Sequence, residues 1–322
     1  MNKLISPTPI LDPTVQTFLD GLAGGKAIQT LSIADARNVL SSVQKVPITP
    51  ADAQVKDVTL PLGPTGSTSI RVVRPAGATG PLPAIVYMHG GGWVLGDCDT
   101  HDRLIRELAI GAHAAVVFVD YERSPEARFP VALEQGYAVA RHVADNADKL
   151  MIDGNHIVIA GDSVGGNMAA VIALMAKERK GPDFKAQVLF YPVTDASMST
   201  RSYEQFATGP WLTADAMSWY WGQYIPEVGQ RAQSHASPIN ATRDELVGLP
   251  PTLLIVDEND VLRDEGEAYG RKLAQAGVRV TSVRYNGTIH DFVMLNALAA
   301  TPAVRGAVGQ AIGYLRSVFS RA

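Results

Sequence analysis

Cysteine is almost missing from this sequence. The 322 residues contain one, Cys98, so no disulfide can form within the chain and no metal site can be built from several cysteine ligands. Disulfide-rich scaffolds and modules held by cysteine-bound zinc are therefore excluded.

A basic excess is missing as well. Lys and Arg number 28 against 32 Asp and Glu, which gives a formal net charge of -4 and an isoelectric point near 6.0. Nucleic acids and anionic membrane surfaces need clustered positive charge, so neither is expected as a partner. A small neutral ligand remains possible.

Long apolar runs are the third absence. No segment of the sequence approaches the ~20 apolar residues that span a bilayer, so no stable membrane association is expected. Near the N-terminus, Pro7, Pro9, Asp12 and Pro13 interrupt any apolar stretch that a signal peptide would need. We therefore expect a cytoplasmic enzyme or receptor.

Short β-branched runs alternate with longer amphipathic stretches along most of the chain. The first two runs alternate apolar and polar residues, as antiparallel edge strands do, whereas most later ones are continuously apolar, as in a parallel sheet buried on both faces. This order predicts βαβ units in a doubly wound α/β sheet. Eight strands are expected, at Val55 to Leu60, Ser69 to Val73, Pro83 to Met88, Ala115 to Tyr121, Ile157 to Gly161, Ala186 to Tyr191, Thr252 to Val256 and Val280 to Tyr285. Helices are expected at Thr100 to His113, Pro130 to Asn146, Gly165 to Lys180, Asp264 to Ala276 and Thr301 to Phe319, with helical patches before the sheet at Val15 to Leu22 and Ile33 to Val43.

Two regions, residues 1–50 and 195–246, do not follow this alternation. The second is an insertion rich in aromatic side chains, including Trp211, Trp219, Tyr220 and Trp221. Such a cluster is either core or a cap over an apolar pocket, and both can hold together. We expect N-terminal cap helices in 1–50, a cap insertion in 195–246, and a catalytic domain made of 51–194 and 247–322.

The segment GDSVG, Gly161 to Gly165, follows a predicted strand and precedes a predicted helix. This is the context of a nucleophile elbow, in which glycines on both sides let the chain turn sharply at a serine. Ser163 is therefore the candidate nucleophile. The alternative is that Asp162 or Ser163 only caps the helix.

The segment HGGGW, His89 to Trp93, directly follows the strand that ends at Met88. Consecutive glycines free backbone N–H groups to hold a developing oxyanion. A flexible turn is one alternative. A dinucleotide loop is another, but the glycine spacing here misses GxGxxG, so that signal is weak.

A nucleophilic serine needs a base and an acid that orients the base. Only His235 and His290 follow Ser163, and His290 lies just past the last predicted strand, where a catalytic histidine is expected.

The acid is expected in DENDVLRDEG, after the strand that ends at Val256, where Asp257, Glu258, Asp260 and Asp264 compete. Asp257 falls at the strand end and Asp264 at the start of the next helix, which favours Asp260. Spacing alone leaves the choice open.

Together these motifs resemble the hormone-sensitive-lipase-like family of α/β-hydrolase esterases, in its bacterial branch with a GDSAGG elbow. The segments that carry the resemblance are HGGGW with its continuation VLGDCDTHDRLIRELA, then DYERSPEARFP, GDSVGG, DVLRDEG and IHDF, and the match runs from about Val55 onward.

The resemblance implies an α/β-hydrolase fold with an eight-stranded, mostly parallel sheet, flanking helices and a helical cap. It assigns the acid to Asp260, the first aspartate of DVLRDEG. It assigns the oxyanion donors to the N–H groups of Gly91, Gly92 and Val164. It also implies hydrolysis of short- to medium-chain acyl esters without a metal or cofactor.

The sequence departs from the family pattern at several positions. Val164 replaces the usual alanine and is expected to crowd the oxyanion donor and trim the acyl pocket. Asp291 replaces the glycine that commonly follows the histidine, which is expected to alter the pKa of His290. Glu122, Arg123 and Ser124 replace the usual R-L-A.

The sequence thus predicts a serine carboxylesterase with a Ser163, His290 and Asp260 triad. Trp93, Phe206 and Trp211 are candidate pocket residues. An amidase, lactonase or arylformamidase could use the same triad. A ligand receptor on the same fold is the other alternative. The gibberellin receptors that resemble this family lack the catalytic histidine, whereas His290 is present here, so a receptor is disfavoured. The strand Val280 to Tyr285 offers a sheet edge for a possible homodimer.

Overall fold

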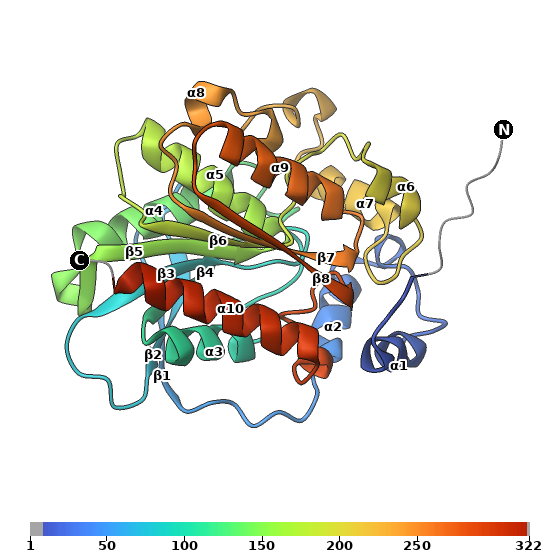
Figure 1. Cartoon of the computed structure of the whole chain (residues 1–322), viewed down its shortest axis with the longest axis horizontal. Helices are drawn as coiled ribbons and strands as arrows, with labels where there is room; N and C mark the ends of the chain where they lie inside the picture. The colour runs from blue at the N-terminus through green and yellow to red at the C-terminus, as the bar shows by residue number, and fades with distance from the viewer. Residues whose placement is uncertain (1–8, 321–322) are drawn as a thin grey trace.

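The computed structural model describes residues 9–320, and an eight-stranded sheet runs through its centre (Figure 1). The strand order is β1-β2-β4-β3-β5-β6-β7-β8. The pairs β1·β2 and β2·β4 are antiparallel, and every later pair in this order is parallel. The predicted α/β-hydrolase fold is confirmed. The strands are β1 Ala53–Leu60, β2 Thr68–Pro75, β3 Leu82–Met88, β4 Ala115–Asp120, β5 Ile152–Asp162, β6 Ala186–Phe190, β7 Thr252–Asn259 and β8 Val280–Ile289.

The expectation that both early strands lie at the edge is wrong for β2, which lies between β1 and β4. Alternation of apolar and polar residues reports that one face of a strand is more exposed than the other, and it does not report whether the strand has a free edge. In β2 the side chains of Ile70 and Val73 are buried, whereas Ser69 between the strand's first buried residues is exposed.

Helices cover both faces of the sheet, α4, α5 and α9 on one face and α3 and α10 on the other (Figure 1). Each predicted helix of the α/β unit is found with its ends within two residues of the expected ones. In α10, the side chain of Thr301 accepts a hydrogen bond from Val304 N and Pro302 occupies the first turn, a common way to begin a helix. The bounds are α3 Asp102–Ala112, α4 Val131–Asp145, α5 Val164–Glu178, α9 Arg263–Gln275 and α10 Pro302–Phe319.

The remaining helices include four that gather near the carboxyl ends of the parallel strands: α1, α2, α6 and α7 (Figure 1). They come from the two regions that interrupt the alternation in sequence, and their bounds are α1 Pro13–Gly21, α2 Ile33–Val43, α6 Arg201–Gln205 and α7 Ala214–Tyr224. This position agrees with a cap over the carboxyl ends of the parallel strands. The division of the chain into cap and catalytic domain stays a prediction.

The end of the 195–246 insertion lies elsewhere. It contains the short helix α8 Arg243–Leu246 and packs beside α5 and α9. Lys177 on α5 donates to the carbonyl of Glu245 at 3.0 Å, and Lys272 on α9 donates to the carbonyl of Ile239 at 2.6 Å. This part of the insertion therefore covers the outer side of the helices rather than the strand ends.

Across residues 9–320, no helix is both long enough and apolar enough to cross a lipid bilayer.

Candidate active site

Ser163 lies at the sharp turn between β5 and α5. Its φ of 54° and ψ of -121° place it in a region that residues with a Cβ rarely adopt. A Cβ on Gly161 would collide with the backbone of Gly165, and a Cβ on Gly165 would collide with the carbonyl of Met88. The turn therefore requires both glycines that the motif supplies. The serine hydroxyl makes no capping bond to α5, so the capping interpretation of Ser163 does not hold.

Three side chains predicted to act together lie in hydrogen-bonding contact. His290 Nε2 is 2.9 Å from Ser163 Oγ, and His290 Nδ1 is 2.8 Å from Asp260 Oδ2. All three residues are at most 4% exposed. An ionised carboxylate only accepts hydrogen bonds, so Nδ1 donates to Asp260, and Nε2 of the neutral ring accepts from the serine hydroxyl. This arrangement suits proton transfer from the serine to the imidazole.

The other acidic residues between Asp257 and Asp264 have different surroundings. Glu258 accepts from Gly287 N at 2.9 Å, and Asp264 accepts from Ser202 N at 2.9 Å. Asp257 is fully buried, and neither of its oxygens has a hydrogen-bond donor among residues 9–320. Of the four competing acids, all within the described residues, only Asp260 is hydrogen-bonded to His290, and its second oxygen accepts from Leu262 N at 3.0 Å.

The second downstream histidine is remote from this cluster. His235 Nε2 lies 3.0 Å from the carboxylate of Glu178 on α5, outside the cavity described below.

Asp291 adds a second carboxylate beside the histidine. Its Oδ1 lies 3.4 Å from His290 Nε2, and its Oδ2 accepts from Trp211 Nε1 at 2.9 Å. Burial alone would lower the pKa of His290, but the charges of Asp260 and Asp291 outweigh it and raise that pKa to about 10. Burial also disfavours the charged form of Asp291 and raises the pKa of its carboxyl, although the charge of His290 acts in the opposite direction. Asp291 is thus one of the groups that raise the pKa of His290, a direction that the sequence alone did not predict.

The glycine loop after β3 faces the serine. Gly91 and Gly92 have φ of 103° and 63°, which favour glycine, and their N–H groups find no acceptor among the described residues. A Cβ on Gly92 would collide with the ring of Tyr220 from α7. Val164 is the first residue of α5, where a backbone N–H has no acceptor within the helix. These groups are therefore free to donate to a ligand.

A buried polar network supports that loop, and it was not identified in the sequence. Asp162 accepts from Tyr87 Oη at 2.8 Å and from Gly90 N at 3.1 Å, and its other oxygen lies 3.3 Å from His101 Nε2. Burial opposes the charge on both partners, but their mutual attraction lowers the pKa of Asp162 and raises that of His101. The only hint in the sequence was that polar residues stand inside two motifs, GDSVG and the DTHD of the glycine-loop continuation.

His89 belongs to the same network but carries no charge. Burial and the neighbouring His101 lower its pKa to about 3. Its ring stacks on Tyr121 with centroids 4.1 Å apart, and Nδ1 lies 2.7 Å from the carbonyl of Gly90. Its role in the glycine loop is packing.

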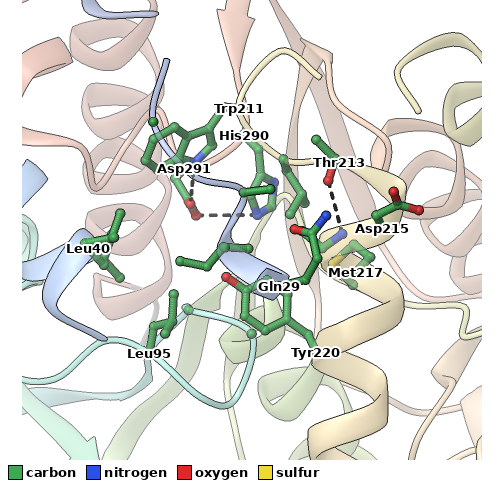
Figure 2. Close-up of a pocket in the computed structure, with 18 of the residues that line it drawn as sticks. Gln29, Leu40, Leu95, Trp211, Thr213, Asp215, Met217, Tyr220, His290 and Asp291 are labelled. Carbon is green, nitrogen blue, oxygen red and sulfur yellow. Dashed lines mark hydrogen bonds and ion pairs between the residues drawn. The ribbon is translucent and has the colours of Figure 1, made fainter. Parts of the chain in front are cut away.

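A cavity of about 750 Å³ opens onto the serine, and Figure 2 shows Asp291 between Trp211 and His290 in its wall. Ser163, His290, Gly91 and Gly92 all line it. The rest of the wall is mainly apolar and comes from α1, α2, α7 and the segments between them: Leu19, Leu22, Ile28, Leu31, Val39, Leu40, Val43, Leu212, Met217 and Tyr220 among others.

Of the three predicted pocket residues, only Trp211 lines the cavity. The prediction is wrong for Trp93, because its indole is fully buried and stacks on Tyr224 with ring centroids 4.2 Å apart. The prediction is also wrong for Phe206. Its ring is buried at the end of α6, and the guanidinium of Arg263 lies 5.3 Å from the ring centre. Val164 was expected to trim the acyl pocket. Its side chain is buried and does not line the cavity, so that expectation is wrong.

One cluster has the residue types of a metal site. Asp257, Asp260 and His290 place one potential ligand atom each within 4.8 Å of one another. The Nδ1 of His290 is already committed to Asp260, so we interpret the cluster as a hydrogen-bonded acid–base set. The expectation that no metal or cofactor is needed stays a prediction.

Comparisons with known proteins agree on one family. A family model described as alpha/beta hydrolase fold matches residues 85–294. The chain is 34% identical to carboxylesterase NlhH of Mycobacterium tuberculosis over 315 residues, which cover 96% of each protein. It is 32% identical to an ethyl acetate hydrolase of Pseudomonas putida over 306 residues, 91% of this chain and 94% of the relative. Among solved structures, a thermostable esterase from Pseudomonas putida ECU1011 superimposes with a TM-score of 0.95 at 48% identity, covering 98% of this chain and all of the other.

Proposed function

The chain belongs to the hormone-sensitive-lipase-like family of the α/β-hydrolase fold and is a carboxylic ester hydrolase, and from this premise we propose that it cleaves short- to medium-chain acyl esters through Ser163, His290 and Asp260. The observation that carries the proposal is the position of His290. It bridges Ser163 Oγ at 2.9 Å and Asp260 Oδ2 at 2.8 Å beside an apolar cavity.

In the first half of the reaction, His290 takes the proton of Ser163 as the serine oxygen attacks the ester carbonyl. Asp260 holds the imidazole by Nδ1, which keeps Nε2 aimed at the serine and stabilises the imidazolium. The C–O bond to the alcohol then breaks, and the imidazolium gives its proton to the departing oxygen. This leaves an acyl group on Ser163.

In the second half, water takes the place of the alcohol. His290 removes a proton from the water as it attacks the acyl carbon, and the serine oxygen leaves with that proton. Each half passes through a tetrahedral oxyanion, which the N–H groups of Gly91, Gly92 and Val164 would stabilise. The free N–H groups of the glycine loop support this assignment.

The cavity supports the proposed substrate class. Its volume of about 750 Å³ and mainly apolar wall suit a substrate of modest size that carries little charge. Helices α1, α2 and α7 contribute to its wall, which supports a bounded pocket rather than an open lipid-binding face.

The serine is tested by covalent labelling and by substitution. An organophosphate should add its mass to Ser163, and Ser163→Ala should lose turnover of a p-nitrophenyl short-chain ester by about 10⁶-fold while keeping its melting temperature. A burst of product from Ser163→Ala, or labelling at another residue, would contradict the assignment.

The substrate range is tested with p-nitrophenyl esters from acetate to dodecanoate and with amides of matched acyl groups. We expect kcat/KM to fall sharply at the longer chains and to be much higher for esters than for amides. A rate that keeps rising to dodecanoate, or equal rates on both bond types, would contradict the proposal.

A further inference from the structure

Asp257 is an acid that the reaction described above does not use. It lies on β7, three residues before Asp260, and is fully buried. Neither of its carboxyl oxygens receives a hydrogen bond from residues 9–320. An ionised carboxylate in such a place would be strongly unfavourable, because it is buried and no donor among the described residues compensates its charge.

The nearest polar groups explain how the cost is avoided. Asp257, Asp260 and His290 each place a polar atom within 4.8 Å of the others. Asp260 already accepts from His290 Nδ1 and from Leu262 N, which stabilise its negative form. Two adjacent buried carboxyls do not both ionise readily, so the proton belongs on the one without donors.

We propose that Asp257 is protonated in the working enzyme and donates a hydrogen bond to the Asp260 carboxylate, which makes it a positioning residue for the catalytic acid. The inference rests on the proposed roles of Ser163, His290 and Asp260. It extends the hydrogen-bonded chain by one member, from Ser163 through His290 and Asp260 to Asp257.

The electrostatics of the site agree with this assignment. Burial and the charge of Asp260 raise the pKa of the Asp257 carboxyl well above its usual range. The other titratable groups that face Asp257 are His290 and Asp291, which follow β8, and Tyr191, which follows β6. None of these supplies a positive charge except His290, whose Nδ1 is directed to Asp260.

This hydrogen bond has a defined effect on the histidine. The donated proton withdraws negative charge from Asp260, so Asp260 holds the imidazolium less strongly than a bare carboxylate would. Loss of the donor should therefore raise the pKa of His290 and leave less neutral base at pH 7. Because Asp257 does not line the cavity, KM should not change.

The test compares Asp257→Leu, which removes the donor, with Asp257→Asn, whose amide N–H replaces it. For Asp257→Leu we expect the acid limb of the kcat/KM profile to move up by about one pH unit, with about a tenfold loss at pH 7 that appears in kcat. Asp257→Asn should restore most of that loss. If both variants move the limb to lower pH, Asp257 is ionised in the wild type and the proposal is wrong.

Glu265 provides a matched control. It is another fully buried acid with one oxygen that has no partner among the described residues, and its other oxygen accepts from Thr194 N at 2.6 Å. Glu265→Gln should leave the pH profile in place. A shift equal to that of Asp257→Leu would show that the effect is general to buried acids and would overturn the proposal.

An NMR titration of His290 separates this inference from the proposed function. It is run in the Ser163→Ala background with and without Asp257→Asn, so it reports the pKa without turnover and does not need the leucine variant to fold. An unchanged pKa on adding Asp257→Asn supports the proton on Asp257, and a lowered pKa overturns it. Failure of the proposed function would instead appear as residual turnover in Ser163→Ala.

Discussion

The indole N–H of Trp211 donates a 2.9 Å hydrogen bond to Asp291, whose other oxygen lies 3.4 Å from the same imidazole nitrogen that faces Ser163. A residue of the 195–246 insertion thus restrains a carboxylate that competes with the serine for His290. Trp211 itself is held by an aromatic contact with Phe18 of α1, with ring centroids 5.4 Å apart. The first two predictions follow from this relationship.

Removal of the indole N–H should weaken catalysis. In Trp211→Phe the ring contact with Phe18 is kept, but the Asp291 carboxylate loses its donor and is left with His290 as its main partner. We expect kcat/KM at pH 7 to fall by about fivefold, the value of one ordinary hydrogen bond. Steady-state kinetics on a p-nitrophenyl ester measures it. The same change in an Asp291→Asn background should have little effect, and an equal loss there would show that the contact does not act through Asp291.

Removal of the Asp291 charge should shift the pH dependence of kcat/KM to lower pH. The charge helps to raise the pKa of His290 to about 10, and the base must be neutral to accept the serine proton, so wild-type kcat/KM should rise with pH through the alkaline range. In Asp291→Asn the pKa of His290 falls, and the acid limb should move to lower pH by about one unit. A profile recorded from pH 5 to 11 checks both statements. An unchanged limb would mean that Asp291 does not influence the base.

The choice of acid is testable with two nearby aspartates, Asp260 in the loop after β7 and Asp264 in the first turn of α9. Asp260→Asn should lower kcat by about 10⁴-fold, because the amide cannot hold the imidazole in the required tautomer. Asp264→Asn is the matched control, since Asp264 accepts from Ser202 N and has no contact with His290. It should keep activity near that of the wild type. A larger loss in Asp264→Asn than in Asp260→Asn would reassign the acid.

The contact between the glycine loop and α7 should be sensitive to a single methyl group. In Gly92→Ala the new Cβ collides with the ring of Tyr220, at a residue whose φ is 63°. We expect the free energy of unfolding to fall by about 1–3 kcal/mol and kcat by about 10²-fold as the oxyanion donors shift.

The control for this substitution is Gly222→Ala on α7, where a Cβ meets nothing within 4 Å. There alanine is the better helix former, so stability should be equal or greater by up to about 1 kcal/mol, with activity retained. Chemical denaturation and kcat measured on both variants decide the point. Similar behaviour of the two alanine variants would contradict the steric explanation.

The sheet and the pair Ser163 and His290 were predictable because their signals are local. Each strand reveals itself by its own run of side chains, and the serine and the histidine each follow such a run directly. The acid was harder, since four carboxylates compete between Asp257 and Asp264 and only the three-dimensional path of the loop separates them. The family resemblance supplied that choice.

The pocket residues could not be derived in the same way. Trp93 directly follows the glycine loop in sequence, but its φ of 60° turns the indole inward against Trp221 and Tyr224. The direction of an aromatic side chain at a loop position is decided by packing partners far away in the chain. The network around Asp162 was missed for a related reason, because His101 and Tyr87 reach it from separate elements.

Asp162 ties the serine turn and the glycine loop into one mechanical unit, because the residue before Ser163 receives the N–H of Gly90. Anyone who transplants this chemistry onto another scaffold would have to carry both loops and His101 together, since a grafted serine turn without its companion loop would leave a buried negative charge with fewer donors. Redesign of the substrate range is better confined to the walls contributed by α1, α2 and α7, which line the cavity and lie outside this unit.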